Sequence, residues 1–83
     1  MECTLRRRSG SPIAGRTVDI GPTGMCVATA RPLAPDEVLS FELSPRIRGQ
    51  ARVLREQTYG CYAVRFESLP APAREELSAL LVR

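Results

Sequence analysis

The chain of 83 residues contains no histidine, no lysine and no tryptophan. Histidine is the commonest general acid or base in enzymes, and lysine is the usual residue that forms Schiff bases. Carboxylates are present, but no two of them are placed in a way that indicates acid–base catalysis. We therefore expect that this protein is not an enzyme.

Cysteine is scarce, with only Cys3, Cys26 and Cys61 in the chain. These residues show no C-x-x-C spacing, and no histidine is available to complete a zinc site. We therefore expect no metal and no tightly bound cofactor. The three thiols are interpreted as small hydrophobic side chains of the core.

Long hydrophobic runs are also missing. No apolar stretch approaches the roughly 20 residues that a membrane-spanning helix requires. The N-terminus carries no apolar segment of the secretory type, because Arg6-Arg7-Arg8 follow almost at once. These features predict a cytoplasmic protein without membrane contact, and the length predicts a single domain over residues 1–83.

All 12 basic residues are arginines, and the formal net charge is +3. Arginine binds phosphate and carboxylate groups through a planar fork of donors and stacks on flat rings. Phosphate binding is therefore one interpretation of this composition, and a genome that favours arginine codons is the other.

Most of the chain alternates between apolar and polar residues, which predicts β-strands. We expect strands at residues 3–8, 13–20, 25–28, 38–43, 47–55 and 61–66, with a hairpin tip at 56–58. In the second strand Val18 and Ile20 are expected to face inward, and Arg16 shares their parity and is expected near the rim of a barrel. Near the C-terminus, Leu77, Leu80 and Leu81 have the spacing of an amphipathic helix, and Pro70 and Pro72 suit its first turn.

This order of elements indicates an all-β-dominated fold, an antiparallel barrel or curled sheet with a C-terminal α-helix packed on it. The stretch from Asp19 to Gly24 connects two of its strands with two glycines, a proline and an acidic residue at the entrance. One interpretation is a small-ligand loop. The other is a plain strand connection, in which Asp19 caps the backbone and the glycines supply positive φ.

The pattern as a whole resembles the PilZ family of six-stranded β-barrels, many of which bind the bacterial messenger cyclic di-GMP. The resemblance is carried by Val18–Met25, which is similar to the family's D/N-x-S-x-x-G motif, by Arg31-Pro32-Leu33 and the strand after it, by Gly49–Val53, by Tyr62–Phe66 and by the helix after Leu69-Pro70. It implies a role in cyclic di-GMP signalling and a ligand site that would include Asp19, Gly21 and Gly24.

Two parts of the family's site differ here. The R-x-x-x-R pair that precedes the first strand in the family is missing, since only Met1 and Glu2 stand there and no two of the arginines at positions 6, 7, 8 and 16 are four apart. The serine of the motif is replaced by Gly21, so one hydroxyl is lost. The resemblance therefore implies a degenerate member that binds cyclic di-GMP weakly or not at all and acts on a protein partner.

Two alternatives stay open. A ligand-competent receptor would use Asp19, the turn from Gly21 to Gly24, and Arg6 and Arg8 as a substitute phosphate grip; otherwise these arginines form a solvated basic strand edge. A small basic barrel that binds nucleic acid is less favoured, because two Tyr and two Phe, three of them expected inside, make a poor stacking platform.

Overall fold

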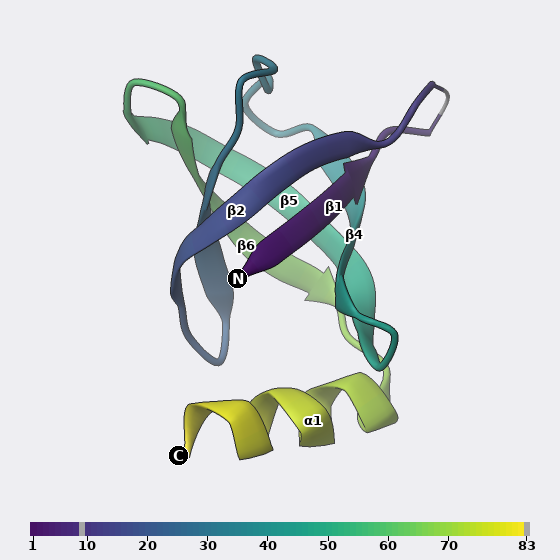
Figure 1. Ribbon diagram of the computed structural model, residues 1–83. Helices are drawn as coiled ribbons and strands as arrows, with labels where there is room; N and C mark the ends of the chain where they lie inside the picture. Colours follow the sequence, from purple (N-terminus) through teal and green to yellow (C-terminus); the bar gives the residue numbers. More distant parts are fainter. Residues whose placement is uncertain (9, 83) are drawn as a thin grey trace.

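The computed structural model of the protein describes residues 1–8 and 10–82 (Figure 1). Over these residues it contains six strands and one helix: β1 (Glu2–Arg6), β2 (Ile13–Ile20), β3 (Gly24–Ala28), β4 (Val38–Ser44), β5 (Ile47–Thr58), β6 (Cys61–Ser68) and α1 (Ala71–Leu81). None of the helical structure described is both long and apolar enough to cross a membrane.

The six strands form a closed barrel in the order β1-β2-β3-β6-β5-β4, and every neighbouring pair is antiparallel. The predicted six-stranded antiparallel barrel with a C-terminal helix is therefore confirmed. Since β1 pairs with both β2 and β4, closure leaves β1 no free edge. The interpretation of Arg6–Arg8 as a basic strand edge is wrong for this reason.

Alternate residues of each strand fill the barrel, because successive side chains of a strand point to opposite faces. The core cluster consists of Cys3, Leu5, Ile13, Met25, Val27, Leu33, Leu39, Phe41, Ile47, Ala51, Val53, Tyr62 and Val64. Phe41 stacks on Phe66 with ring centroids 5.1 Å apart. Of the three cysteines only Cys3 is buried as predicted, whereas Cys26 and Cys61 are half-buried.

A β-bulge in β2 overturns part of the predicted alternation. Thr17 pairs with Val27 and Asp19 with Cys26, so Val18 is an extra residue without a partner on β3. Val18 is consequently 66% exposed, although the sequence pattern predicted an inward side chain. Arg16 was expected to share the inward parity of Val18, but it is also exposed. Before the bulge, every second residue counted from Ile13 points inward, and Arg16 lies on the opposite, outward face.

Two predicted strand ends also differ from the structure. β1 ends at Arg6, so Arg7 and Arg8 lie in the connection to β2 and not within a strand. β5 continues through Thr58, and the hairpin tip is Tyr59-Gly60, where Gly60 supplies the positive φ. The tip predicted at residues 56–58 is therefore part of β5.

Helix α1 lies below the barrel in Figure 1 and contacts β5. Pro70 is its N-cap residue, and Pro72 lies in its first turn, as the sequence predicted. Ala73 and Leu77 are buried, and Leu80 packs against the core, which confirms the apolar stripe. An ion pair of 3.2 Å between Arg46 and Glu76 joins the helix to the turn between β4 and β5.

Candidate functional site

The turn between β2 and β3 is held by backbone hydrogen bonds. The Gly21 N–H donates to the Gly24 carbonyl at 2.8 Å, and the Phe66 N–H donates to the Thr23 carbonyl at 2.9 Å. The turn is therefore closed on itself and tied to β6. This is the geometry of a firm strand connection, and it places Asp19 at its entrance.

The glycines of this turn serve a different purpose from the one predicted. Among the described residues, the glycines with positive φ are Gly10 and Gly60, so neither Gly21 nor Gly24 is needed for backbone conformation. A Cβ atom at Gly24 would overlap the carbonyl oxygen of Val64, whereas one at Gly21 would have no neighbour nearer than the Gly24 oxygen, 3.8 Å away. Gly24 is therefore required for close packing of β3 on β6, and Gly21 is not.

A hollow of about 290 Å³ lies beside the turn, and its lining includes Asp19, Gly21, Gly24, Cys26 and Gln57. Asp19 is exposed at this hollow. Burial raises the pKa of the Cys26 thiol to about 11, with further contributions from Cys61 and from the charge of Asp19. The structure thus brings together three of the predicted site residues, Asp19, Gly21 and Gly24.

The other two predicted site residues, Arg6 and Arg8, lie far from this hollow. Arg6 ends β1 just beyond Leu5, which pairs with Ile13 at the start of β2, whereas Asp19 lies six residues further along β2. At about 3.3 Å per residue the separation along the strand is roughly 20 Å, which an arginine side chain does not span. We call these regions the arginine end, around Arg6–Arg8, and the turn end, around Asp19–Gly24; they lie at the upper right and lower left of Figure 1.

Arg7 has a structural role that the sequence pattern did not show. Its guanidinium group forms an ion pair with Glu37 and donates to the Pro32 carbonyl at 2.8 Å, while Glu37 accepts the Ala34 N–H at 3.0 Å. The hydrogen bond between the two side chains raises the pKa of Arg7 and lowers the pKa of Glu37. Because Arg7 and Glu37 are 30 residues apart, no local spacing could have predicted this pair.

Two other arginines lie closer to the turn end. Arg65 pairs with Gly24 in the register of β3 and β6, and Arg55 pairs with Ala63 in that of β5 and β6. Both side chains are exposed, since Tyr62 and Val64 take the inward positions of β6. The outward parity of Arg65 was visible in the sequence, but its proximity to the turn depends on the pairing of β3 with β6, which no local pattern reveals.

Acidic residues reduce the positive charge that these arginines offer. Glu67 lies 3.5 Å from Arg65 and 3.2 Å from Arg52. The hydrogen bond from Arg52, with a smaller contribution from Arg65, lowers the pKa of Glu67, so the carboxylate is ionised at neutral pH. Arg65 therefore faces the turn end with its charge partly balanced.

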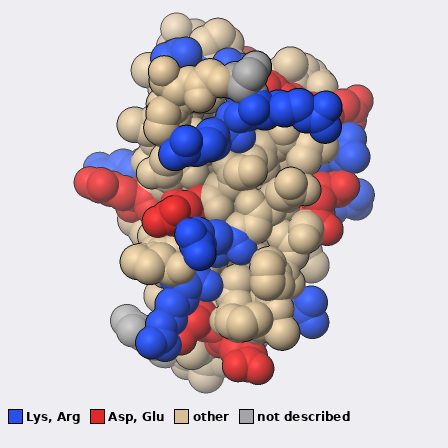
Figure 2. Space-filling view, turned by 90° about the vertical axis from the view of Figure 1, so that its right-hand side faces the viewer, with Lys and Arg blue, Asp and Glu red and all other residues tan. Residues whose placement is uncertain are grey.

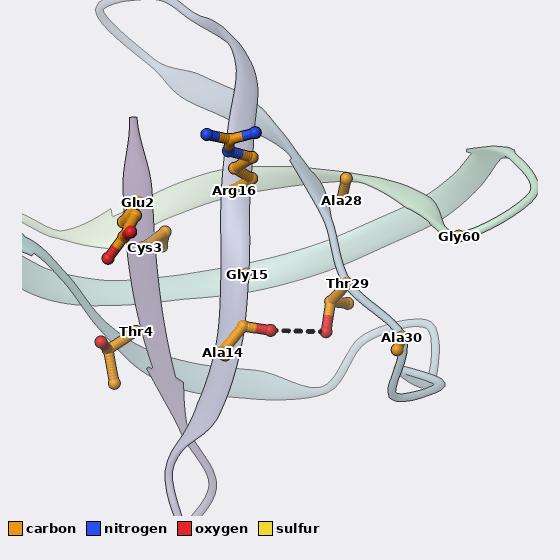
Figure 3. A pocket seen from close by; sticks show the side chains of 10 residues that line it. All are labelled: Glu2, Cys3, Thr4, Ala14, Gly15, Arg16, Ala28, Thr29, Ala30 and Gly60. Carbon is orange, nitrogen blue, oxygen red and sulfur yellow. Dashed lines mark hydrogen bonds between the residues drawn. The ribbon is translucent and has the colours of Figure 1, made fainter.

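A larger hollow, of about 600 Å³, lies elsewhere on the barrel wall, over β1, β2 and the end of β3 (Figure 3). Its walls are mostly backbone and small side chains, and Thr29 donates a hydrogen bond of 3.0 Å to the Ala14 carbonyl. Glu2 and Arg16 contribute opposite charges from paired positions of β1 and β2. None of the predicted site residues lines this hollow.

The side of the barrel drawn in Figure 2 is not uniformly basic. Figure 2 shows arginine side chains across the upper part of one side of the barrel, with acidic side chains between and below them. Of the four aromatic residues, Tyr59 is fully exposed, whereas Phe41 and Tyr62 are buried and Phe66 packs against the core. A single exposed ring does not form a platform on which successive bases could stack.

Comparison with known proteins agrees with this geometry. The family model described as the PilZ domain matches residues 1–83, the full length of the chain. Comparisons with curated proteins and with solved structures find no match. The match over the whole chain, the closed six-stranded barrel with its C-terminal helix, and the Asp19–Gly24 turn between β2 and β3 place this protein in the PilZ domain family, a family of cyclic di-GMP signalling.

Proposed function

We propose that this protein is a degenerate PilZ domain, which binds cyclic di-GMP weakly or not at all and acts as an adaptor through contacts with a protein partner. It is a binding module and not an enzyme. The observation that carries this proposal is the separation of Arg6 and Arg8 from the turn end by the length of β2. The phosphates of a ligand held at Asp19 would not reach these two guanidinium groups.

Hydrogen-bond energies give the size of the effect. A hydrogen bond to a charged group contributes about 1.5–3 kcal/mol. Arg6 and Arg8 do not reach the turn end, and Gly21 there carries no hydroxyl. Each 1.4 kcal/mol corresponds to about a tenfold change in affinity. Although such terms are not strictly additive, their loss is large enough to convert a micromolar site into one weaker than millimolar.

A titration tests this proposal directly. Cyclic di-GMP is added to isotope-labelled protein, and backbone amide shifts are followed up to millimolar ligand. We expect no saturable shifts at residues 19–24. Saturable shifts there with a micromolar dissociation constant would indicate a competent receptor and would contradict the proposal.

Matched variants identify the source of any binding that is found. Asp19→Ala removes the carboxylate at the turn end, and Arg8→Ala removes a cation at the arginine end. Binding through the receptor alternative requires Arg6 and Arg8, so Arg8→Ala would weaken it. Binding that depends on Asp19 and on Arg65 instead would show that the turn end recruits a different arginine.

The adaptor part of the proposal is supported by an exposed aromatic side chain. Tyr59 stands at the tip of the hairpin between β5 and β6 with its whole side chain in solvent. Tyrosine is enriched at protein interfaces, where one ring supplies contact area and its hydroxyl a hydrogen bond. For any partner identified by co-purification, we expect Tyr59→Ser to weaken binding. Arg8→Ala replaces another exposed side chain away from the hairpin tip; it is the control and should leave binding unchanged.

A further inference from the structure

Two of the three cysteines face each other on the outer wall of the barrel. In the antiparallel register of β3 and β6, Cys26 pairs with Ala63 and Ala28 pairs with Cys61, so the two cysteines are diagonal neighbours on one face. Their sulfur atoms are 2.7 Å apart, although 35 residues separate them in the sequence. Non-bonded carbon atoms rest about 3.5–4.0 Å apart, and sulfur is larger, so these thiols are in unusually close contact.

The two sulfur atoms are close to the geometry of a covalent link. A disulfide bond is about 2.05 Å long, so the sulfurs need to approach by only about 0.7 Å. The paired strands β3 and β6 hold them there without a change of topology. Both thiols are half-buried, whereas Cys3 is buried in the core on the inner face of β1. A small oxidant in solvent therefore reaches Cys26 and Cys61 but not Cys3.

We propose that Cys26 and Cys61 form a modification site, a dithiol that a small peroxide converts reversibly into a disulfide between β3 and β6. In the first step the sulfur of one cysteine, as the thiolate, attacks a peroxide oxygen, which gives a sulfenic acid and releases one water. In the second step the other thiol displaces the hydroxyl group as a second water. Two thiols thus lose two electrons and two protons, and one hydrogen peroxide is reduced to two waters.

The surroundings of the pair set the rate of this reaction. Cys26 faces Cys61 from β6, the Asp19 carboxylate from β2 and Gln57 from β5, whose amide oxygen accepts its S–H at 3.3 Å. Burial, together with Cys61 and the charge of Asp19, raises the pKa of Cys26 to about 11. Because the thiolate is the reactive form, the rate should rise with pH between pH 7 and 9.

Closure of the disulfide also changes the turn end. Cys26 lines the hollow beside Asp19 and Gly24, and its S–H is lost when the bond forms. The hydrogen bond to Gln57 disappears with it. This inference does not depend on cyclic di-GMP binding, since the reaction involves only the two thiols and the peroxide.

Peptide mapping after oxidation tests the proposal. The full chain is treated with hydrogen peroxide, denatured with an alkylating agent and digested with trypsin, which places the three cysteines on separate peptides, 1–6, 17–46 and 56–65. We expect a link between peptides 17–46 and 56–65, a mass lower by two hydrogen atoms, free Cys3, and full reversal by dithiothreitol. A link that involves Cys3, a dimer between chains, or thiols that remain free would overturn the proposal.

Further measurements test the proposal independently of peptide mapping. Cys61→Ser should abolish the internal link. Oxidation of Cys26 should then halt at the sulfenic acid, which a sulfenic-acid probe detects, because no second thiol is present to displace its hydroxyl group. If that variant does not fold, the pH dependence of the native chain remains: a rate that is flat between pH 7 and 9 contradicts the thiol chemistry described. Amide shifts on oxidation should be confined to β3, β6, residues 19–24 and the neighbourhood of Gln57 on β5, and shifts spread over the whole barrel would contradict a local link between β3 and β6.

Discussion

At the arginine end of the barrel, Arg7 is bound by Glu37 and Pro32, so one of three consecutive arginines serves to hold two connections together. At the turn end, Asp19 is exposed beside a hollow, and the nearest outward arginine on β6, Arg65, shares its charge with Glu67. The comparison shows that a net positive charge does not tell where cations are available. An arginine that is paired with a carboxylate, as Arg7 is with Glu37, holds the fold together and offers less charge to a ligand.

The two ends also differ in how their strands are joined. The arginine end uses an ion pair between segments far apart in the sequence, whereas the turn end uses close backbone packing of β3 on β6 and two thiols in contact.

The largest effect is expected from oxidation of Cys26 and Cys61. A link that closes a loop of about 35 residues removes conformational entropy from the unfolded chain and should stabilise the protein by roughly 3–4 kcal/mol. Denaturant unfolding of the oxidised and reduced protein measures this difference. Cys61→Ser treated in the same way is the control, and an equal gain in that variant would exclude the link as its cause.

The next effect is expected from Gly24→Ala. Its Cβ atom would overlap the Val64 carbonyl oxygen, so β3 and β6 must move apart, and overpacking of this kind costs about 1–3 kcal/mol. Gly21→Ala in the same turn is the matched control and should change the free energy of unfolding by less than about 0.5 kcal/mol. Equal effects at both positions would show that the turn conformation, and not the packing of β3 on β6, requires glycine.

The fold was largely predictable because it depends on local periodicity. Alternation in the strands that contain Leu39, Phe41 and Val53 matches their burial, and the leucine stripe of the helix matches its packing. The inward position predicted for Val18 failed because Val18 is the extra residue of a bulge, whereas Ile20, which follows the bulge, packs against the core as predicted. A bulge leaves no mark in the apolar pattern that would distinguish it from a regular strand.

The candidate site was less predictable because it depends on which strands are neighbours. The turn from Asp19 to Gly24 could be found from its residues, but Arg65 and Cys61 meet it only through the pairing of β3 with β6. In the same way, the pairing of Arg7 with Glu37 requires the chain to be folded, because the two residues belong to different connections. Residue types thus indicated the kind of chemistry, and topology decided which groups meet.

A smaller effect is expected from Arg7→Met, which removes the partner of Glu37 at the arginine end. Because Arg7 lowers the pKa of Glu37 in the folded state, the stability that this pair contributes is fully present above the unfolded pKa of about 4.5. This stability is lost as the pH falls through the lowered pKa of Glu37 in the folded state. The variant should therefore be less stable than the native protein at pH 7, and the two should converge at low pH.

Thermal unfolding from pH 7 to pH 3 measures this convergence. Glu67 also has a lowered pKa and loses its contribution in acid, so the difference between the native protein and the variant, and not the acid slope of either, is the informative quantity. Arg8→Met is the control and should leave stability unchanged at every pH. A constant difference between Arg7→Met and the native protein down to pH 3 would mean that Arg7 acts through packing alone.

The smallest effect is expected from Gly21→Ser, which restores the hydroxyl of the family motif at the turn end. The position has space, since a Cβ atom there lies 3.8 Å from the nearest atom, so the free energy of unfolding should change by less than about 0.5 kcal/mol. One restored hydrogen bond should not produce micromolar binding of cyclic di-GMP, because Arg6 and Arg8 remain at the other end of β2. If micromolar binding does appear in the amide titration, a cation at the turn end must replace the missing pair. Arg65→Ala in the Gly21→Ser background would then abolish it, and the contrast drawn between the two ends would be wrong.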